Sequence, residues 1–99
     1  MTLTDEHLRL AIRHIAQDAP CNMARSLFAP GASVSIGLGV ASIIAPGQQT
    51  GPILHLGEPC PVFRSVPMMI SLPHHAGWHH GLLRAIPFAA LGLRREVAA

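Results

Sequence analysis

The sequence predicts an α+β domain in which an N-terminal amphipathic helix packs on a small antiparallel sheet, with a short helix at the C-terminal end. Three observations support this class. An apolar stripe with helical spacing lies near the start, bulky apolar residues alternate with small ones from residue 33 onward, and Pro-Gly pairs separate the segments. The chain has 99 residues, so we expect a single domain over residues 1–99.

The first element is predicted to be a helix from about Thr4 to Asp18. Thr4 can cap it, and Asp5 places a negative charge in the first turn, at the positive end of the helix dipole. The apolar stripe of this helix consists of Leu8, Ala11, Ile12 and Ile15. Pro20 ends the helix, because the residue before a proline is disfavoured in the α conformation. A second, short helix is expected over residues 22–28.

The clearest strand prediction covers residues 33–41. Its bulky positions are Val34, Ile36, Leu38 and Val40, and the positions around them hold Ser, Gly or Ala. Strict alternation favours one half-buried strand, which we extend to residue 45. A returning strand over residues 52–57 would complete a hairpin, and a third extended segment covers residues 62–72. Pro67 lies inside that segment and favours either a place at the edge of the sheet or a break in the strand.

The next stretch, residues 73–81, holds four histidines and the single Trp, and it is expected to form a loop. After it, Pro87 suits the first turn of a final short helix, with Phe88 and Leu91 turned inward.

The histidines of residues 73–81 are candidate metal ligands, because imidazole is the commonest metal ligand in proteins and suits Zn, Ni or Cu. The candidates are His74, His75, His79 and His80. Neighbouring residues of a strand point to opposite sides, so all four cannot easily converge on one ion within one copy. A site shared across a symmetry axis needs only one or two ligands from each copy. The alternatives are a solvated loop with incidental metal affinity and a proton-sensitive contact, and no other cofactor is expected.

The composition indicates a surface that needs a partner. Only 12% of the residues are charged and 49% are hydrophobic, whereas an ordinary soluble domain carries roughly 25% charge. A domain this small buries only about two-thirds of the surface that its unfolded chain exposes. We therefore expect a small non-enzymatic interaction or assembly protein, homo-oligomeric or bound to another protein, of the kind that phages and mobile elements use as accessories or inhibitors. Metal binding by the histidine loop is the alternative function.

Contacts with the partner are expected along the outer edge of residues 62–72, on the small-residue face of residues 33–41 and around Leu10. The candidate interface residues are Leu10, Arg13, Phe63, Met68, Ile70 and Trp78.

Other function classes have little support in the sequence. The net charge of +2 is too small to favour nucleic acid, and the best apolar run, residues 32–45, is shorter than the roughly 18 residues that a membrane span needs. The chain has no lysine for a phosphate-binding loop and lacks a nucleophile elbow, so no catalytic residue is expected. Two cysteines and the absence of a secretory signal favour free thiols in a reducing, cytoplasmic setting.

Overall fold

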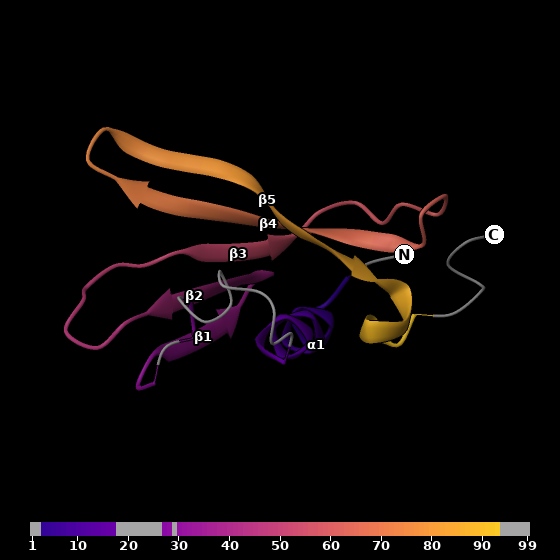
Figure 1. The fold of residues 1–99 in the computed structure, drawn as a ribbon, viewed down its shortest axis with the longest axis horizontal. Helices are drawn as coiled ribbons and strands as arrows, with labels where there is room; N and C mark the ends of the chain where they lie inside the picture. Colours follow the sequence, from indigo (N-terminus) through magenta and orange to yellow (C-terminus); the bar gives the residue numbers. More distant parts are fainter. Residues whose placement is uncertain (1–2, 18–26, 29, 94–99) are drawn as a thin grey trace.

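The computed structural model describes residues 3–17, 27–28 and 30–93, whose arrangement is shown in Figure 1. In chain order the elements are helix α1 (Asp5–Ala16), strands β1 (Ser33–Gly37), β2 (Val40–Ile44), β3 (Ile53–Leu56), β4 (Ser65–His74) and β5 (Gly77–Pro87), and a 3-10 turn, η1 (Phe88–Leu91). The mixed α and β class is therefore confirmed, and the sheet is its larger part. The predicted helix over residues 22–28 lies outside the described residues except for Leu27 and Phe28, as does the chain after Leu93.

Helix α1 falls within the range that the sequence predicts, and the four residues of its apolar stripe are all buried. At its start the N–H of Thr4 donates a hydrogen bond to Nδ1 of His7 at 2.9 Å. Asp5 links the helix to the sheet, because its Oδ1 accepts a hydrogen bond of 2.8 Å from the N–H of Gly39. No helix within the described ranges is both long enough and apolar enough to cross a membrane.

The five strands form one antiparallel sheet in the order β1-β2-β3-β4-β5, so each strand pairs with the next one along the chain. The prediction that residues 62–72 form an edge strand is wrong, because β4 lies between β3 and β5. Pro67 fits there because its carbonyl accepts a hydrogen bond of 2.8 Å from the N–H of Gly57, just after β3 ends. Its missing N–H faces the same side, just beyond the last paired residues, Leu56 and Met68, so the proline costs a single hydrogen bond at the end of the β3–β4 ladder.

Residues 33–41 do not form one strand, so the prediction of a single half-buried strand there is also wrong. Leu38 and Gly39 make a two-residue turn with φ angles of 54° and 80°, and the chain reverses into β2. Gly37 pairs with Val40 across this turn, so the bulky residues before and after the turn point to opposite faces of the sheet. As a result Ile36 shares its face with Ala41, and Val40 lies on the opposite face.

The β4–β5 hairpin extends beyond the rest of the sheet. The ladder between β3 and β4 ends at Ser71, whereas β4 and β5 stay paired as far as His74 and Gly77. Residues 73–81 therefore form strands around a tight turn rather than the predicted loop. We call residues 72–79 the arm; it is the two-stranded ribbon at the upper left of Figure 1.

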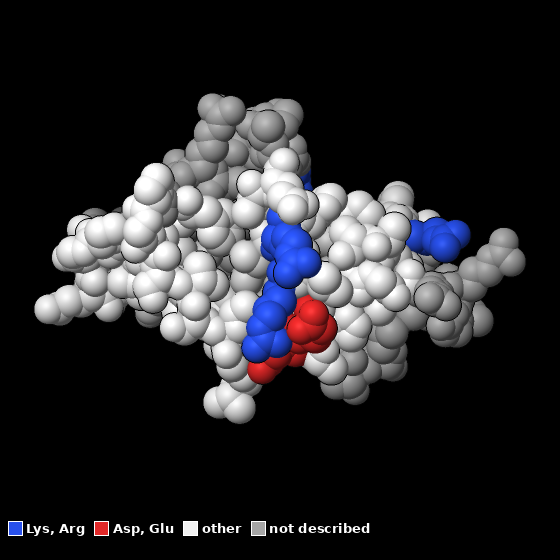
Figure 2. Space-filling view, turned by 90° about the horizontal axis from the view of Figure 1, so that it is seen from below, with Lys and Arg blue, Asp and Glu red and all other residues white. Residues whose placement is uncertain are grey.

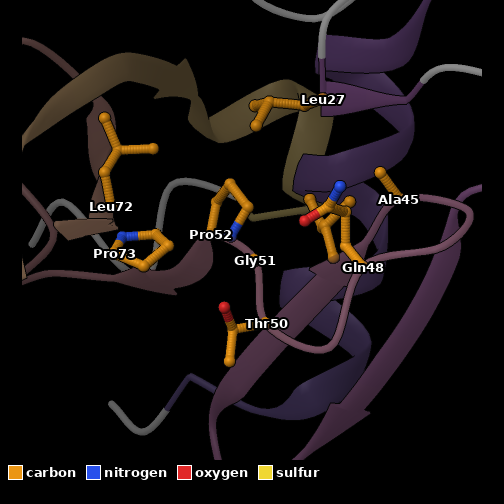
Figure 3. A pocket seen from close by; sticks show the side chains of 9 residues that line it. Leu27, Ala45, Gln48, Thr50, Gly51, Pro52, Leu72 and Pro73 are labelled. Atoms are coloured by element: carbon orange, nitrogen blue, oxygen red, sulfur yellow. The ribbon is translucent and has the colours of Figure 1, made fainter. Parts of the chain in front are cut away.

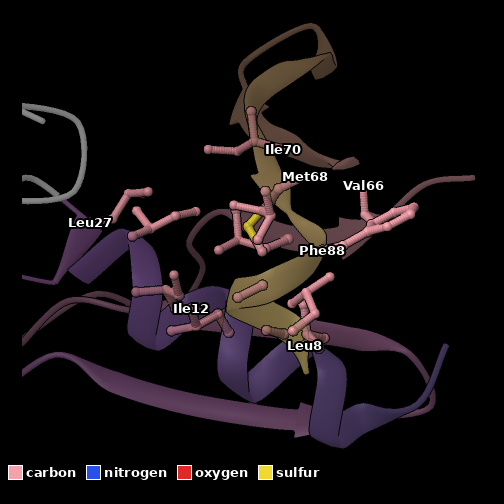
Figure 4. Close-up of a cluster of buried hydrophobic side chains, with 14 of the residues drawn as sticks. Leu8, Ile12, Leu27, Val66, Met68, Ile70 and Phe88 are labelled. Atoms are coloured by element: carbon pink, nitrogen blue, oxygen red, sulfur yellow. The ribbon is translucent and has the colours of Figure 1, made fainter. Parts of the chain in front are cut away.

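The buried side chains of α1, η1 and the sheet form one hydrophobic cluster, part of which is shown in Figure 4. Its members are Leu8, Ala11, Ile12, Ile15, Leu27, Ala41, Ile43, Leu54, Val66, Met68, Ile70, Ile86, Phe88, Leu91 and Leu93. Phe88 and Leu91 of η1 point inward as the sequence predicts. The sheet residues of this cluster lie on one face of the sheet, which we call the core face.

Candidate protein interaction surfaces

The pairing register defines a second face of the sheet, opposite the core face. Directly opposed residues of neighbouring strands share a face. Two cross-strand rows follow from the pairing: Ser42, Ile53, Ser71 and His80 form one, and Val40, His55, Met69 and Leu82 form the other. We call these two rows, with Ile44 of β2 and Trp78 of β5, the open face.

The open face is apolar and partly exposed. Leu82 is 62% exposed, Trp78 47% and Val40 40%, and none of its residues belongs to the core cluster. The buried residues of α1 and η1 pack with the core face, so neither of the described helices covers the open face. An antiparallel sheet with one face in water usually alternates apolar and polar residues. Here the outer positions mix hydroxyl and imidazole side chains with large apolar ones, such as Leu82 and Trp78.

Charge is almost absent from the sheet. All five strands lie within the described residues, and Arg84 of β5 is their only Asp, Glu, Lys or Arg. Much of the remaining charge is on α1, and Figure 2 shows a narrow stripe of charged side chains on an otherwise mostly uncharged face. One surface pair in this helix joins Glu6 and Arg9 at 3.3 Å. Exposed pairs of this kind contribute at most about 1 kcal/mol.

The predicted contact residues fall into two groups. Met68 and Ile70 are only 0% and 6% exposed, so the expectation that they reach a partner is corrected. Pairing with Leu56 and Leu54 of β3 places Met68 and Ile70 on the core face. The alternation of apolar residues in the sequence does not show which face is buried, because that depends on how the strands pair. Arg13 is exposed on α1, whereas Leu10 is half-buried against the core.

The other two predicted contact residues, Phe63 and Trp78, are exposed, and so are two residues that the sequence analysis missed. Val62 is 83% exposed beside Phe63 at 80%, and Leu82 shares the open face with Trp78. Val62 could have been found from its place next to Phe63 in a proline-bounded turn. No sequence feature marks Leu82 as exposed. It lies on the open face because the register of β4 and β5 shifts between Met68 and Met69, which brings Leu82 opposite Met69.

Val62 and Phe63, which we call the knob, lie on a closed loop between β3 and β4. Cys60 and Ser65 exchange backbone hydrogen bonds of 2.8 and 3.2 Å at its base. Arg64 takes a φ of 52°, and its carbonyl accepts a 2.9 Å hydrogen bond from the N–H of Phe88. These bonds hold the loop so that two large apolar side chains point into solvent.

A pocket of about 320 Å³ lies between the β2–β3 loop and the base of the arm (Figure 3). It is lined by Leu27, Ile43, Ala45, Gln48, Thr50, Gly51, Pro52, Leu72 and Pro73. No ionisable side chain is among them. A smaller hollow of about 250 Å³ lies on the open face, between the same loop and Trp78.

The four candidate metal ligands are divided between the arm, which holds His74, His75 and His79, and the open face, which holds His80. The ring of His74 lies 4.0 Å from that of His75 and 4.3 Å from that of His79, measured between centroids. His80 belongs to the open face instead, where its Nδ1 and Oγ of Ser71 are hydrogen-bonded at 2.7 Å. In the part of the chain that the structure describes, no group of three or more His, Cys, Asp or Glu side chains is arranged to hold a metal ion. A metal site shared between copies stays a prediction.

Among the described residues Cys60 is the only cysteine, a half-buried free thiol at the base of the knob loop; Cys21 lies outside them. Comparison of the chain with protein-family models, with curated proteins and with solved structures finds no match.

Proposed function

We propose that this protein is a non-enzymatic assembly protein whose copies associate through their open faces. The observation that carries the proposal is a sheet face that neither described helix covers, with Leu82 and Trp78 exposed and with no charged residue in its rows. Burial of apolar surface drives most protein association, in proportion to the area removed from water.

Face-to-face packing of two copies suits this surface. Two sheets pack at about 10 Å with their strands within about 30° of each other, which would turn each open sheet into half of a β-sandwich. A two-fold axis brings like residues near one another. The rows hold no Asp, Glu, Lys or Arg that would lie near its own copy, and Met69 and Trp78 are of types enriched in the cores of interfaces.

The experiment places a charge on the open face. Leu82→Arg should leave the fold intact, because Leu82 is already 62% exposed. It should abolish pairing of the open faces, so that at low protein concentration the particle approaches the monomer mass of 10.5 kDa. Sedimentation velocity over a range of concentrations measures this. Leu38→Arg is the matched control, because Leu38 is fully exposed in the β1–β2 turn, away from the open face. Equal masses for the wild-type protein and the Leu82→Arg variant would refute the proposal.

Repeating the measurement with a chelator tests the alternative function. An assembly that survives chelation is held by apolar burial. If the assembly instead dissociates into monomers, a metal ion at the interface between copies holds it together, with histidines of the arm as ligands.

A further inference from the structure

We propose that the knob of one copy docks into the 320 Å³ pocket of a second copy, a contact separate from the pairing of open faces. The occupant of the pocket is thus the Val62-Phe63 pair of another molecule of this chain. This inference goes beyond the proposed function, because it needs neither the open face nor a two-fold axis.

The knob has the properties of a pre-formed anchor. Its two side chains are 83% and 80% exposed, so water surrounds both of them. Its loop is closed by the Cys60–Ser65 bridge and fixed to η1 through the carbonyl of Arg64. A loop already held in one conformation loses little entropy on binding, and buried aromatic anchors dominate the energetics of many interfaces. A non-glycine residue at positive φ, such as Arg64, is a strained conformation of the kind that clusters at functional sites.

The pocket matches the knob in size and in chemistry. Pockets for small molecules usually measure about 300–1,000 Å³, so a cavity of about 320 Å³ suits one or two side chains. Leu27, Ile43 and Leu72 supply apolar walls, while Gln48 and Thr50 supply polar groups. Neither the knob pair nor the pocket lining carries a charge, so docking leaves no ionised group buried without a partner.

The positions of the two features require different copies. The molecule is 45 Å long, and Figure 1 shows the β3–β4 loop at one end of this axis and the β2–β3 loop at the other. A knob therefore cannot reach the pocket of its own chain. Contact between two different patches is heterologous, and its repetition produces a ring or an open chain of molecules.

The test uses the Leu82→Arg protein, in which pairing of the open faces has been removed. A knob variant adds Val62→Ser and Phe63→Ser, and a pocket variant adds Ala45→Trp, which places an indole in the pocket from an exposed position. Leu38→Ser, at the fully exposed residue of the other apolar turn, is the control. Circular dichroism confirms that each variant is folded.

We expect the Leu82→Arg parent and its Leu38→Ser control to associate at concentrations up to about 1 mM, and each site variant to associate at least about thirtyfold more weakly. A mixture of the knob variant and the pocket variant should form a one-to-one dimer and nothing larger, because only one intact knob and one intact pocket remain.

Three outcomes would overturn the inference: a monomeric Leu82→Arg parent at about 1 mM, site variants that associate as the parent does, or a mixture that stays monomeric. Failure of the proposed function gives a different result. In that case the Leu82→Arg protein keeps the mass of the wild-type protein, whatever the knob and pocket variants do.

Discussion

Gly51 has a role that only its neighbours in space reveal. A Cβ atom added there would overlap the carbonyl oxygen of Ile43, and the N–H of Ile43 donates a 3.0 Å hydrogen bond to the carbonyl of Pro52. The chain of the β2–β3 loop can run this close to β2 only without a side chain. In the sequence, Gly51 looks like any other loop glycine.

We therefore expect Gly51→Ala to lower the free energy of unfolding by about 1–3 kcal/mol or more, because the clash is with backbone that must move. Urea denaturation at a fixed protein concentration measures this. Gly81→Ala is the matched control, since no heavy atom lies within 4 Å of the added methyl group, and it should be neutral or slightly stabilising. Equal midpoints for the two variants would contradict the close approach at Gly51.

Strand β4 shows how a single element serves both faces of the sheet. Met68 is fully buried on the core face, and its neighbour Met69 is half-buried on the open face. The sequence presents them as two identical residues in an apolar run. Their different environments follow from the pairing of β4 with Leu56 and His55 of β3, which the period of the sequence alone does not specify.

This difference gives a prediction with an internal control. In the Leu82→Arg background, Met68→Ala should lower the free energy of unfolding by about 2–5 kcal/mol, the usual cost of a cavity in a core, and Met69→Ala should cost clearly less. In the wild-type background, Met69→Ala should instead weaken association. Urea denaturation and sedimentation measure the two effects, and a larger loss of stability for Met69→Ala would show that the two faces have been assigned the wrong way round.

For the whole molecule, the uneven distribution of charge decides how association should respond to salt. The open face and the knob carry no charge, and most of the described charge lies on α1 or in the β3–β4 loop. Raising the ionic strength from 0.1 to 1 M shortens the screening length from about 10 to 3 Å and so removes attraction between surface charges.

We therefore expect the association constant to stay the same or to increase between about 0.1 and 1 M NaCl, and to increase further in sulfate, which favours burial. Light scattering at several protein concentrations measures it. Dissociation in high salt would show that ion pairs, such as those available to Arg13 on α1, hold the copies together.

The sequence by itself determined the local features of this protein. The stripe from Leu8 to Ile15 specified α1, because a helical period needs no knowledge of distant residues. The shortage of charge predicted exposed apolar surface, and large apolar side chains such as Leu82 are exposed. Phe63 and Trp78 were named as candidate contact residues, and both are exposed.

Only the tertiary structure decided which face each strand residue occupies, because the two-residue turn at Leu38 and Gly39 reverses the alternation and the pairing sets the rest. It also placed Met68 and Ile70 in the core, turned residues 73–81 into a hairpin, and put the knob and the pocket at opposite ends of the molecule. Each of these depends on contacts between residues far apart in the chain, and local sequence patterns do not encode such contacts.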